Sequence, residues 1–196
     1  MPNTQAPFGF QHIGYLEGAA PTSGNAVRKI ASNYNTAIYF GDPVVSVSTG
    51  YIQRAAAGTT QIAGIFIGCK YLSTSQGRTI WMRYWPGSDA AADVEAYIIN
   101  SPQALFQVQA GGAATAIGFA DINANANFGL GTGNATTGQS GAFLDQTTLG
   151  TTTTHPFRVV DIVTFPSGAN GTDAASAYNF VIVTFNWQDF KSTTGI

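Results

Sequence analysis

Short apolar runs, broken at intervals by turn-forming residues, are the dominant pattern of this chain. The runs recur about every 8 to 15 residues, which is typical of the strands of a barrel or sandwich. No stretch shows the 3.6-residue period of an amphipathic helix longer than a few turns. The predicted strands are 37–40, 44–47, 51–54, 61–71, 78–85, 93–99, 104–109, 157–163 and 178–185. The pattern therefore predicts an all-β protein with a small barrel or sandwich core.

Residues 1–30 lack this regularity and are predicted to form an extended N-terminal arm. Pro or Gly at positions 2, 7, 9, 14, 18, 21 and 24 interrupts any strand or helix period. The arm nevertheless carries Phe8, Phe10, Tyr15 and Leu16, which must be buried against something else. They can fold back on the parent domain or lie across a neighbouring subunit. The second alternative is favoured, so these four residues are the candidate inter-subunit contact.

Residues 31–196 are predicted to form a single β domain that contains a loop-rich insertion at 111–154. Gly, Ala, Asn and Thr dominate the insertion, as in 129–134 and 151–154. Such a composition fits short strands or long loops. It offers too few large apolar side chains for an isolated core.

Aromatic residues are dense in the predicted strand 78–85. Strict alternation places Trp81 and Trp85 on one face and Tyr84 on the other. The three rings could form a sugar-stacking platform. Because they fall on both faces, the pattern favours packing in a core and an interface.

The chain is unusually poor in charge: 9% of its residues are charged, where a soluble domain has roughly a quarter. Its surface must consist largely of hydroxyl and amide groups, which cost less to desolvate than ions. This suits a protein covered by neighbours, and it equally suits an extracellular or thermally robust domain with a neutral surface. The net charge of −2 provides no basic face for phosphates, so no nucleic-acid partner is expected.

Histidine and cysteine are too few for a metal or nucleophile site. His12, His155 and Cys69 are the only such residues, and they lie far apart without metal-ligand spacing. Cys69 sits in an apolar run, which predicts a buried, inert thiol. We therefore expect no catalytic residue, no bound metal and no cofactor.

The acidic residues and the glycine-rich loops give the same answer. Asp89, Asp93 and Glu95 cluster around one turn, as on a solvated edge, whereas a glycosidase needs two carboxylates facing across a cleft. The stretch 131–138 lacks the Gly-Lys-Ser/Thr ending of a phosphate loop. No segment approaches the about 20 apolar residues that span a bilayer, and no secretion signal is recognisable, so no membrane partner is expected.

An ordered series of motifs resembles the capsid decoration proteins of tailed bacteriophages. The series consists of Ala-Ile-Tyr-Phe-Gly-Asp-Pro-Val-Val at 37–45, a turn at 49–50, and Ile-Ala-Gly-Ile-Phe-Ile-Gly at 62–68. In that family a strand, Gly-Asp-Pro-Val, a second strand, a variable loop and Ile-x-Gly-Val-x-Val-Gly build a small β-barrel, sometimes called a β-tulip. The N-terminal segment 6–10, and 158–161 with 178–179, also resemble structural proteins of tailed phages.

The resemblance implies a non-enzymatic virion structural protein, a decoration or cement protein. It would bind the outside of the assembled capsid at capsomer junctions, on the virion surface, after synthesis in the host cytoplasm. Its expected partners are the major capsid protein and itself, as a homotrimer. Phe8, Phe10, Tyr15 and Leu16 would then contact the capsid or another subunit. The alternatives are a tail-tube or other virion subunit and, less favoured, a carbohydrate-binding module.

Overall fold

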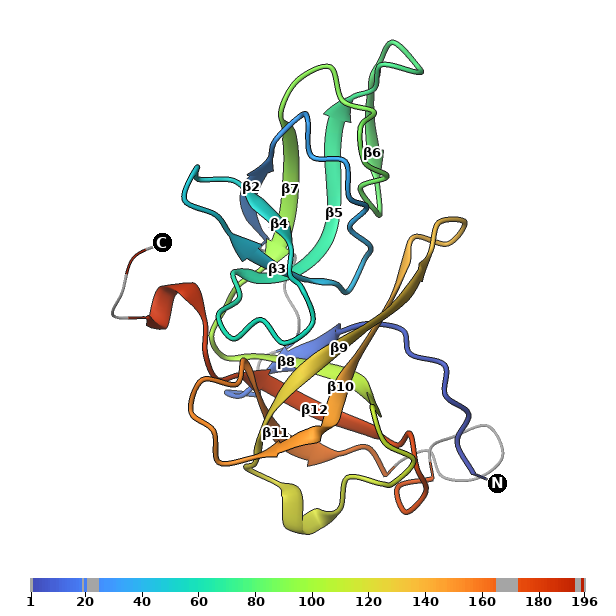
Figure 1. Ribbon diagram of the computed structural model, residues 1–196, viewed down its shortest axis with the longest axis vertical. Helices are drawn as coiled ribbons and strands as arrows, with labels where there is room; N and C mark the ends of the chain where they lie inside the picture. Colours follow the sequence, from blue (N-terminus) through green and yellow to red (C-terminus); the bar gives the residue numbers. More distant parts are fainter. Residues whose placement is uncertain (1, 19, 21–24, 165–172, 193–194, 196) are drawn as a thin grey trace.

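The computed structural model describes residues 2–18, 20, 25–164, 173–192 and 195. In Figure 1 the chain forms two β units stacked along the long axis, a closed barrel below and a curled open sheet above. In the described part of the chain the only helical segments are two three-residue 3-10 turns, η1 (Phe119–Asp121) and η2 (Asp189–Lys191). The prediction of an all-β protein with a small barrel is confirmed.

The lower unit, called the barrel unit, contains six strands. They are β1 (Gln11–Tyr15), β8 (Ala104–Gly111), β9 (Asn125–Asn134), β10 (Gln139–Gly150), β11 (Phe157–Ile162) and β12 (Phe180–Phe185). Five of them close in the order β8-β10-β9-β11-β12 and back to β8, while β1 attaches to β8. One edge of β8 pairs with β12. The other edge pairs with β1 at 104–107 and, in parallel, with β10 at 110–111, so both edges of β8 are used.

Alternating side chains of these strands fill the barrel with aromatic and aliphatic groups. Along β8, Ala104, Phe106 and Val108 point inward and are fully buried. The Phe157 ring stacks on Phe10 at a centroid distance of 4.3 Å and on Phe185 at 5.9 Å. Burying such large rings supplies much of the hydrophobic stabilisation of a unit this size.

The upper unit, called the open-sheet unit, also contains six strands. They are β2 (Ala26–Ile30), β3 (Pro43–Ser46), β4 (Ile52–Arg54), β5 (Gly64–Leu72), β6 (Thr79–Met82) and β7 (Val94–Ile99). The order is β2-β7-β5-β3-β4, and β6 pairs with β5. Its separate core centres on Trp85, which is fully buried and donates its indole N–H to the Tyr34 carbonyl at 3.1 Å.

The structure divides the chain differently from the sequence prediction. The segment 1–30 is not one irregular arm, because 11–15 and 26–30 form β1 and β2; residues 1, 19 and 21–24 of the expected arm lie outside the described residues. Residues 31–196 build two cores rather than one. The segment 111–154 contains the long strands β9 and β10, which complete the barrel, so the prediction of a loop-rich insertion is wrong there.

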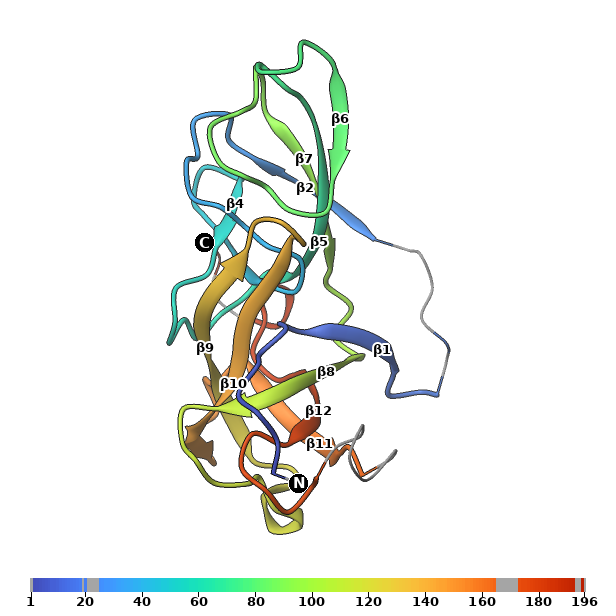
Figure 2. The same cartoon turned by 90° about the vertical axis from the view of Figure 1, so that its right-hand side faces the viewer.

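The end of the chain connects the two units. After β12, the amide N–H of Asp189 donates to the Ile62 carbonyl at 3.0 Å, and the Gln188 side chain donates to the Asn100 carbonyl at 2.7 Å. In Figure 2, β1 lies along the side of the barrel near the waist between the units. The two units are thus held together by several segments that are far apart in the sequence.

Candidate interaction surfaces

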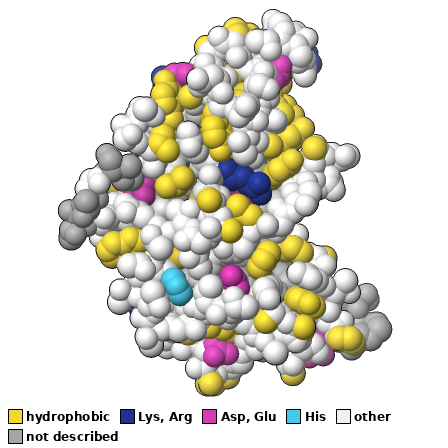
Figure 3. Space-filling view, in the orientation of Figure 1, with side chains coloured by type: hydrophobic (Ala, Val, Ile, Leu, Met, Phe, Trp, Pro, Cys, Tyr) yellow, Lys and Arg dark blue, Asp and Glu magenta, His cyan; other side chains and the backbone are white. Residues whose placement is uncertain are grey.

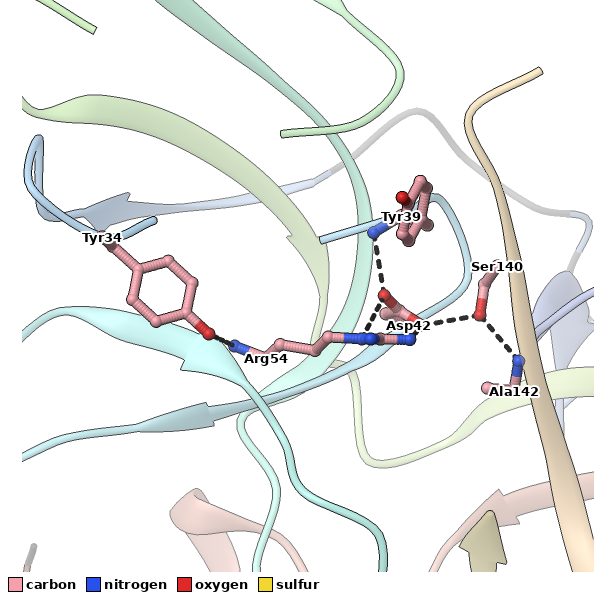
Figure 4. A network of polar contacts seen from close by, with 6 residues as sticks. All are labelled: Tyr34, Tyr39, Asp42, Arg54, Ser140 and Ala142. Carbon is pink, nitrogen blue, oxygen red and sulfur yellow. Dashed lines mark hydrogen bonds and ion pairs between the residues drawn. The ribbon is translucent and has the colours of Figure 1, made fainter. Parts of the chain in front are cut away.

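The Gly-Asp-Pro turn at 41–43 lies at the junction of the two units (Figure 4). The Asp42 carboxylate is fully buried and accepts hydrogen bonds from the Tyr39 backbone N–H at 2.8 Å and the Ser140 hydroxyl at 2.6 Å. The Arg54 guanidinium supplies the counter-charge, with Nε 2.8 Å and Nη2 3.2 Å from the two carboxylate oxygens. Pairing and hydrogen bonding are what make a buried carboxylate tolerable.

This network joins the units because its members come from both. Ser140 belongs to β10 of the barrel unit, and its hydroxyl also accepts the Ala142 N–H at 2.9 Å. Arg54 belongs to β4 of the open-sheet unit, and its backbone N–H donates to the Tyr34 hydroxyl at 3.0 Å. The buried Asp42, with its partners Arg54 and Ser140, therefore links the two units, and we call this network the latch. The motif that carries the family resemblance has a structural role at this position.

His12 and Cys69 both lie in partly or fully buried, largely apolar surroundings. The described residues contain no group of three His, Cys, Asp or Glu side chains that could hold a metal ion. His12 packs against Tyr15 and Phe106, and burial lowers its pKa. Burial raises the pKa of the Cys69 thiol to about 12, so the thiol stays protonated. The prediction of a buried Cys69 is confirmed.

The acidic cluster does not form a paired-carboxylate site. Asp89 accepts hydrogen bonds from the Ser73 hydroxyl and the Ser75 backbone N–H, which lower its pKa to about 2. Asp93 accepts from the Tyr51 hydroxyl at 2.8 Å and Glu95 from the Tyr97 hydroxyl at 2.7 Å. Each of these acids thus has its own local partner.

Within the described residues, no helix is both long and apolar enough to span a bilayer.

The four predicted contact residues of the N-terminal segment lie in different environments. Phe10 is fully buried in the barrel core, so its prediction as a surface contact is wrong. Phe8 is half-buried with its ring 5.5 Å from Phe180, and Tyr15 is half-buried beside the same core. Leu16 is 49% exposed. The alternative of folding back thus holds for Phe10, and of the four residues Leu16 alone is exposed.

A second exposed apolar group lies on η1. Phe119 is 83% exposed and forms one wall of an apolar groove of about 470 Å³, whose other lining residues include Ile162, Ala174 and Ala175. Both Phe119 and Leu16 belong to the barrel unit. No sequence pattern had marked Phe119, although a lone phenylalanine in a Gly/Ala-rich loop is a signal that could have been used.

The outer face of the open sheet carries a third exposed group, with Trp81 at its centre. Trp81 is 61% exposed, whereas Trp85 lies in the core and Tyr84 stacks on Tyr39 at 5.6 Å. The three aromatics therefore do not form one platform. The prediction that Trp81 and Trp85 share a face is wrong, because β6 ends at Met82 and the chain then turns inward.

A cleft of about 670 Å³ lies at the waist between the units. Its walls are residues 35–37 with Tyr39 on one side and 130–133 on the other, with Arg54 beside them. On the face shown in Figure 3, the largest patch of Lys and Arg side chains lies at this waist. The Arg54 guanidinium beside this cleft is paired with the buried Asp42 carboxylate.

Comparison with known proteins adds no family to this picture. No family model, no curated protein and no solved structure matches the chain. The fold and its exposed surfaces therefore carry the functional argument.

Proposed function

We propose that this protein is a capsid decoration, or cement, protein of a tailed bacteriophage. It binds the outside of the assembled capsid, contacts the major capsid protein and further copies of itself as a homotrimer, and stabilises the shell without catalysis. The observation that carries the proposal is the exposure of Leu16 and Phe119 at separate places on the barrel unit of a chain with very few charges. A lattice subunit meets several neighbours at once and needs several separate apolar anchors.

The barrel unit is the part that faces the shell in this proposal. It carries both anchors, its core is closed, and the latch at Asp42 fixes its position relative to the open sheet. A rigid subunit loses little conformational entropy on binding. Each copy would bury about 1,000–2,000 Å², and many symmetric copies convert a modest affinity into a stable shell. Binding the assembled lattice but not its dissociated parts stabilises the lattice by linkage.

The test is the occupancy of purified virus particles. We expect hundreds of copies per particle by quantitative mass spectrometry, and loss of most of them for the double variant Leu16→Ser, Phe119→Ser. Each lost anchor should weaken binding by about 2 kcal/mol, or about thirtyfold. Val27→Ser, which removes an exposed apolar side chain of the open-sheet unit, is the matched control and should keep full occupancy.

Three outcomes would contradict the proposal. Absence of the protein from particles removes it altogether. A small copy number confined to the tail identifies a tail-tube subunit instead. Full occupancy of the double variant shows that the barrel unit does not face the shell.

A further inference from the structure

The Trp81 ring is held in a fixed position on the outer face of the open sheet. Its benzo part lies over Gly68, where an added Cβ would come within 3.0 Å of Cη2 and 3.2 Å of Cζ2. One side of the indole is therefore supported by glycine backbone, while the side chain as a whole stays 61% exposed. The Tyr97 ring lies beside it at 6.1 Å, tilted by 34°. The two rings make a shallow apolar surface that is fixed before any ligand arrives.

Hydrogen-bonding groups of both kinds border these rings. In the strand register, Lys70 of β5 lies opposite Trp81 of β6 on one side and opposite Glu95 of β7 on the other. Residues directly opposite one another in a sheet project from the same face. Glu95 accepts the Tyr97 hydroxyl through Oε1, which leaves Oε2 without a hydrogen-bond partner among the described residues. Lys70 is exposed, and its ammonium is a donor.

The chemistry of this face fits a sugar better than a protein. The chain has eight basic and ten acidic residues, and three of them, Lys29, Lys70 and Glu95, lie in the row that borders the rings. Cores of protein interfaces are depleted in charged residues. A pyranose ring instead presents an apolar C–H face for an aromatic ring and a rim of hydroxyls that both donate and accept. Donors and acceptors around a small apolar platform match that pattern.

We infer that the outer face centred on Trp81 and Tyr97 is a carbohydrate-binding platform. Its ligand class is a neutral oligosaccharide, because two rings tilted by 34° form a shallow apolar surface and the neighbouring charges, Lys70 and Glu95, are of opposite sign. The sugar stacks on Trp81, and its hydroxyls donate to Glu95 and accept from Lys70. This activity goes beyond shell stabilisation. The platform belongs to the open-sheet unit, and the proposed shell contacts belong to the barrel unit, so both can operate at once.

Cellohexaose is the probe, followed by tryptophan fluorescence and by the indole N–H signals in two-dimensional NMR. We expect saturable binding in the millimolar range or tighter, with the Trp81 indole signal shifting most. Trp81→Ala should weaken binding about tenfold, a loss of the size seen where a nucleic-acid base stacks on a single aromatic side chain. Its thermal unfolding midpoint should stay unchanged because the side chain is largely exposed.

Two further variants separate stacking from a general loss of aromatic surface. Phe190→Ala removes another exposed aromatic ring, 59% exposed on η2, and should leave cellohexaose binding unchanged. Tyr97→Phe keeps the ring but removes the hydroxyl that orients Glu95, so it should weaken binding less than Trp81→Ala does.

Either of two results would overturn the inference. One is the absence of saturable binding together with an unmoved Trp81 signal. The other is that the Trp81→Ala variant no longer binds virus particles, while cellohexaose does not compete with particle binding by the unaltered protein. This result would make the face a protein contact. Failure of the proposed function is a separate result, because a protein absent from particles can still be titrated with the sugar.

Discussion

The barrel unit and the open-sheet unit differ in whether the edges of their sheets are paired with another strand. In the barrel unit the strands close on themselves, and β8 pairs along both of its edges. In the open-sheet unit β2 and β4 end the strand order, and no strand pairing joins them in the described chain. Closure removes exposed edges and fixes the core from within. The open sheet must instead gain part of its order from the barrel below it.

The two units also differ in where their aromatic rings lie. The barrel unit buries its rings against one another, as Phe157 does with Phe10 and Phe185. The open-sheet unit buries Trp85 on one face and leaves Trp81 on the other in solvent. The barrel unit therefore uses most of its rings in its own core, whereas the open-sheet unit leaves one sheet face with an exposed ring.

The largest expected effect comes from opening the barrel core. Phe157→Ala removes a fully buried ring and should lower the free energy of unfolding by about 3–5 kcal/mol. If the barrel supports the sheet, circular dichroism in urea shows a single transition at a lower midpoint. Phe119→Ala, a truncation of an exposed ring, is the control and should change stability by no more than about 0.5 kcal/mol. Separate unfolding of the open-sheet unit in Phe157→Ala would show that the barrel unit does not support the sheet.

The next effect comes from releasing the latch between the units. Asp42→Asn leaves the Arg54 guanidinium without its counter-charge and should cost about 3 kcal/mol. Ser140→Ala removes the hydroxyl that donates to Asp42 and accepts from the Ala142 N–H, and should cost about 1.5 kcal/mol. We expect Asp42→Asn to resolve unfolding into two calorimetric transitions, one for each unit. Glu17→Gln, at an exposed acid, is the control. One unchanged transition in Asp42→Asn would show that the latch does not couple the units.

The smallest effect is confined to the tip of the β5–β6 hairpin. The folded pKa of Asp89 is about 2, below its ordinary 3.8, because Ser73 and Ser75 donate to the carboxylate. The order that these hydrogen bonds give to the turn at 73–75 is therefore fully present above pH 3.8, and it is lost as the pH falls through about 2. Hydrogen exchange of the Ser75 amide should accelerate, relative to a neighbouring exposed amide, across this range. In Asp89→Asn the exchange should lose this pH dependence, and an unaltered profile would exclude the carboxylate as its cause.

The sequence predicted the strands of the central chain well and the Gly-rich strands poorly. From 43 to 111, alternation and turn residues mark nearly every strand that the structure contains. β9 and β10 were missed because glycine weakens a strand pattern. The structure gives the reason for one of these glycines: the Phe143 ring lies against Gly129 of β9, and also against Gly111 of β8, where a side chain would clash. Such a requirement depends on a partner strand and is not visible locally.

The candidate contacts were predicted only in part, for a similar reason. Leu16 and Phe10 are both apolar residues in an irregular segment, yet one is exposed and the other is in the barrel core. Their difference depends on β1 pairing with β8, about ninety positions along the chain. Trp81 and Trp85 differ because β6 ends between them. Tertiary placement, and not residue type, decides which aromatic side chain meets solvent.

The double pairing of β8 sets an order on synthesis. Residues 104–111 leave the ribosome early, but the strand that closes one of their edges, β12, ends at Phe185. Until β12 has left the ribosome, the edge of β8 that pairs with it stays open and the phenylalanines of the barrel are not fully enclosed. A nascent chain therefore cannot close the barrel before β12 has left the ribosome.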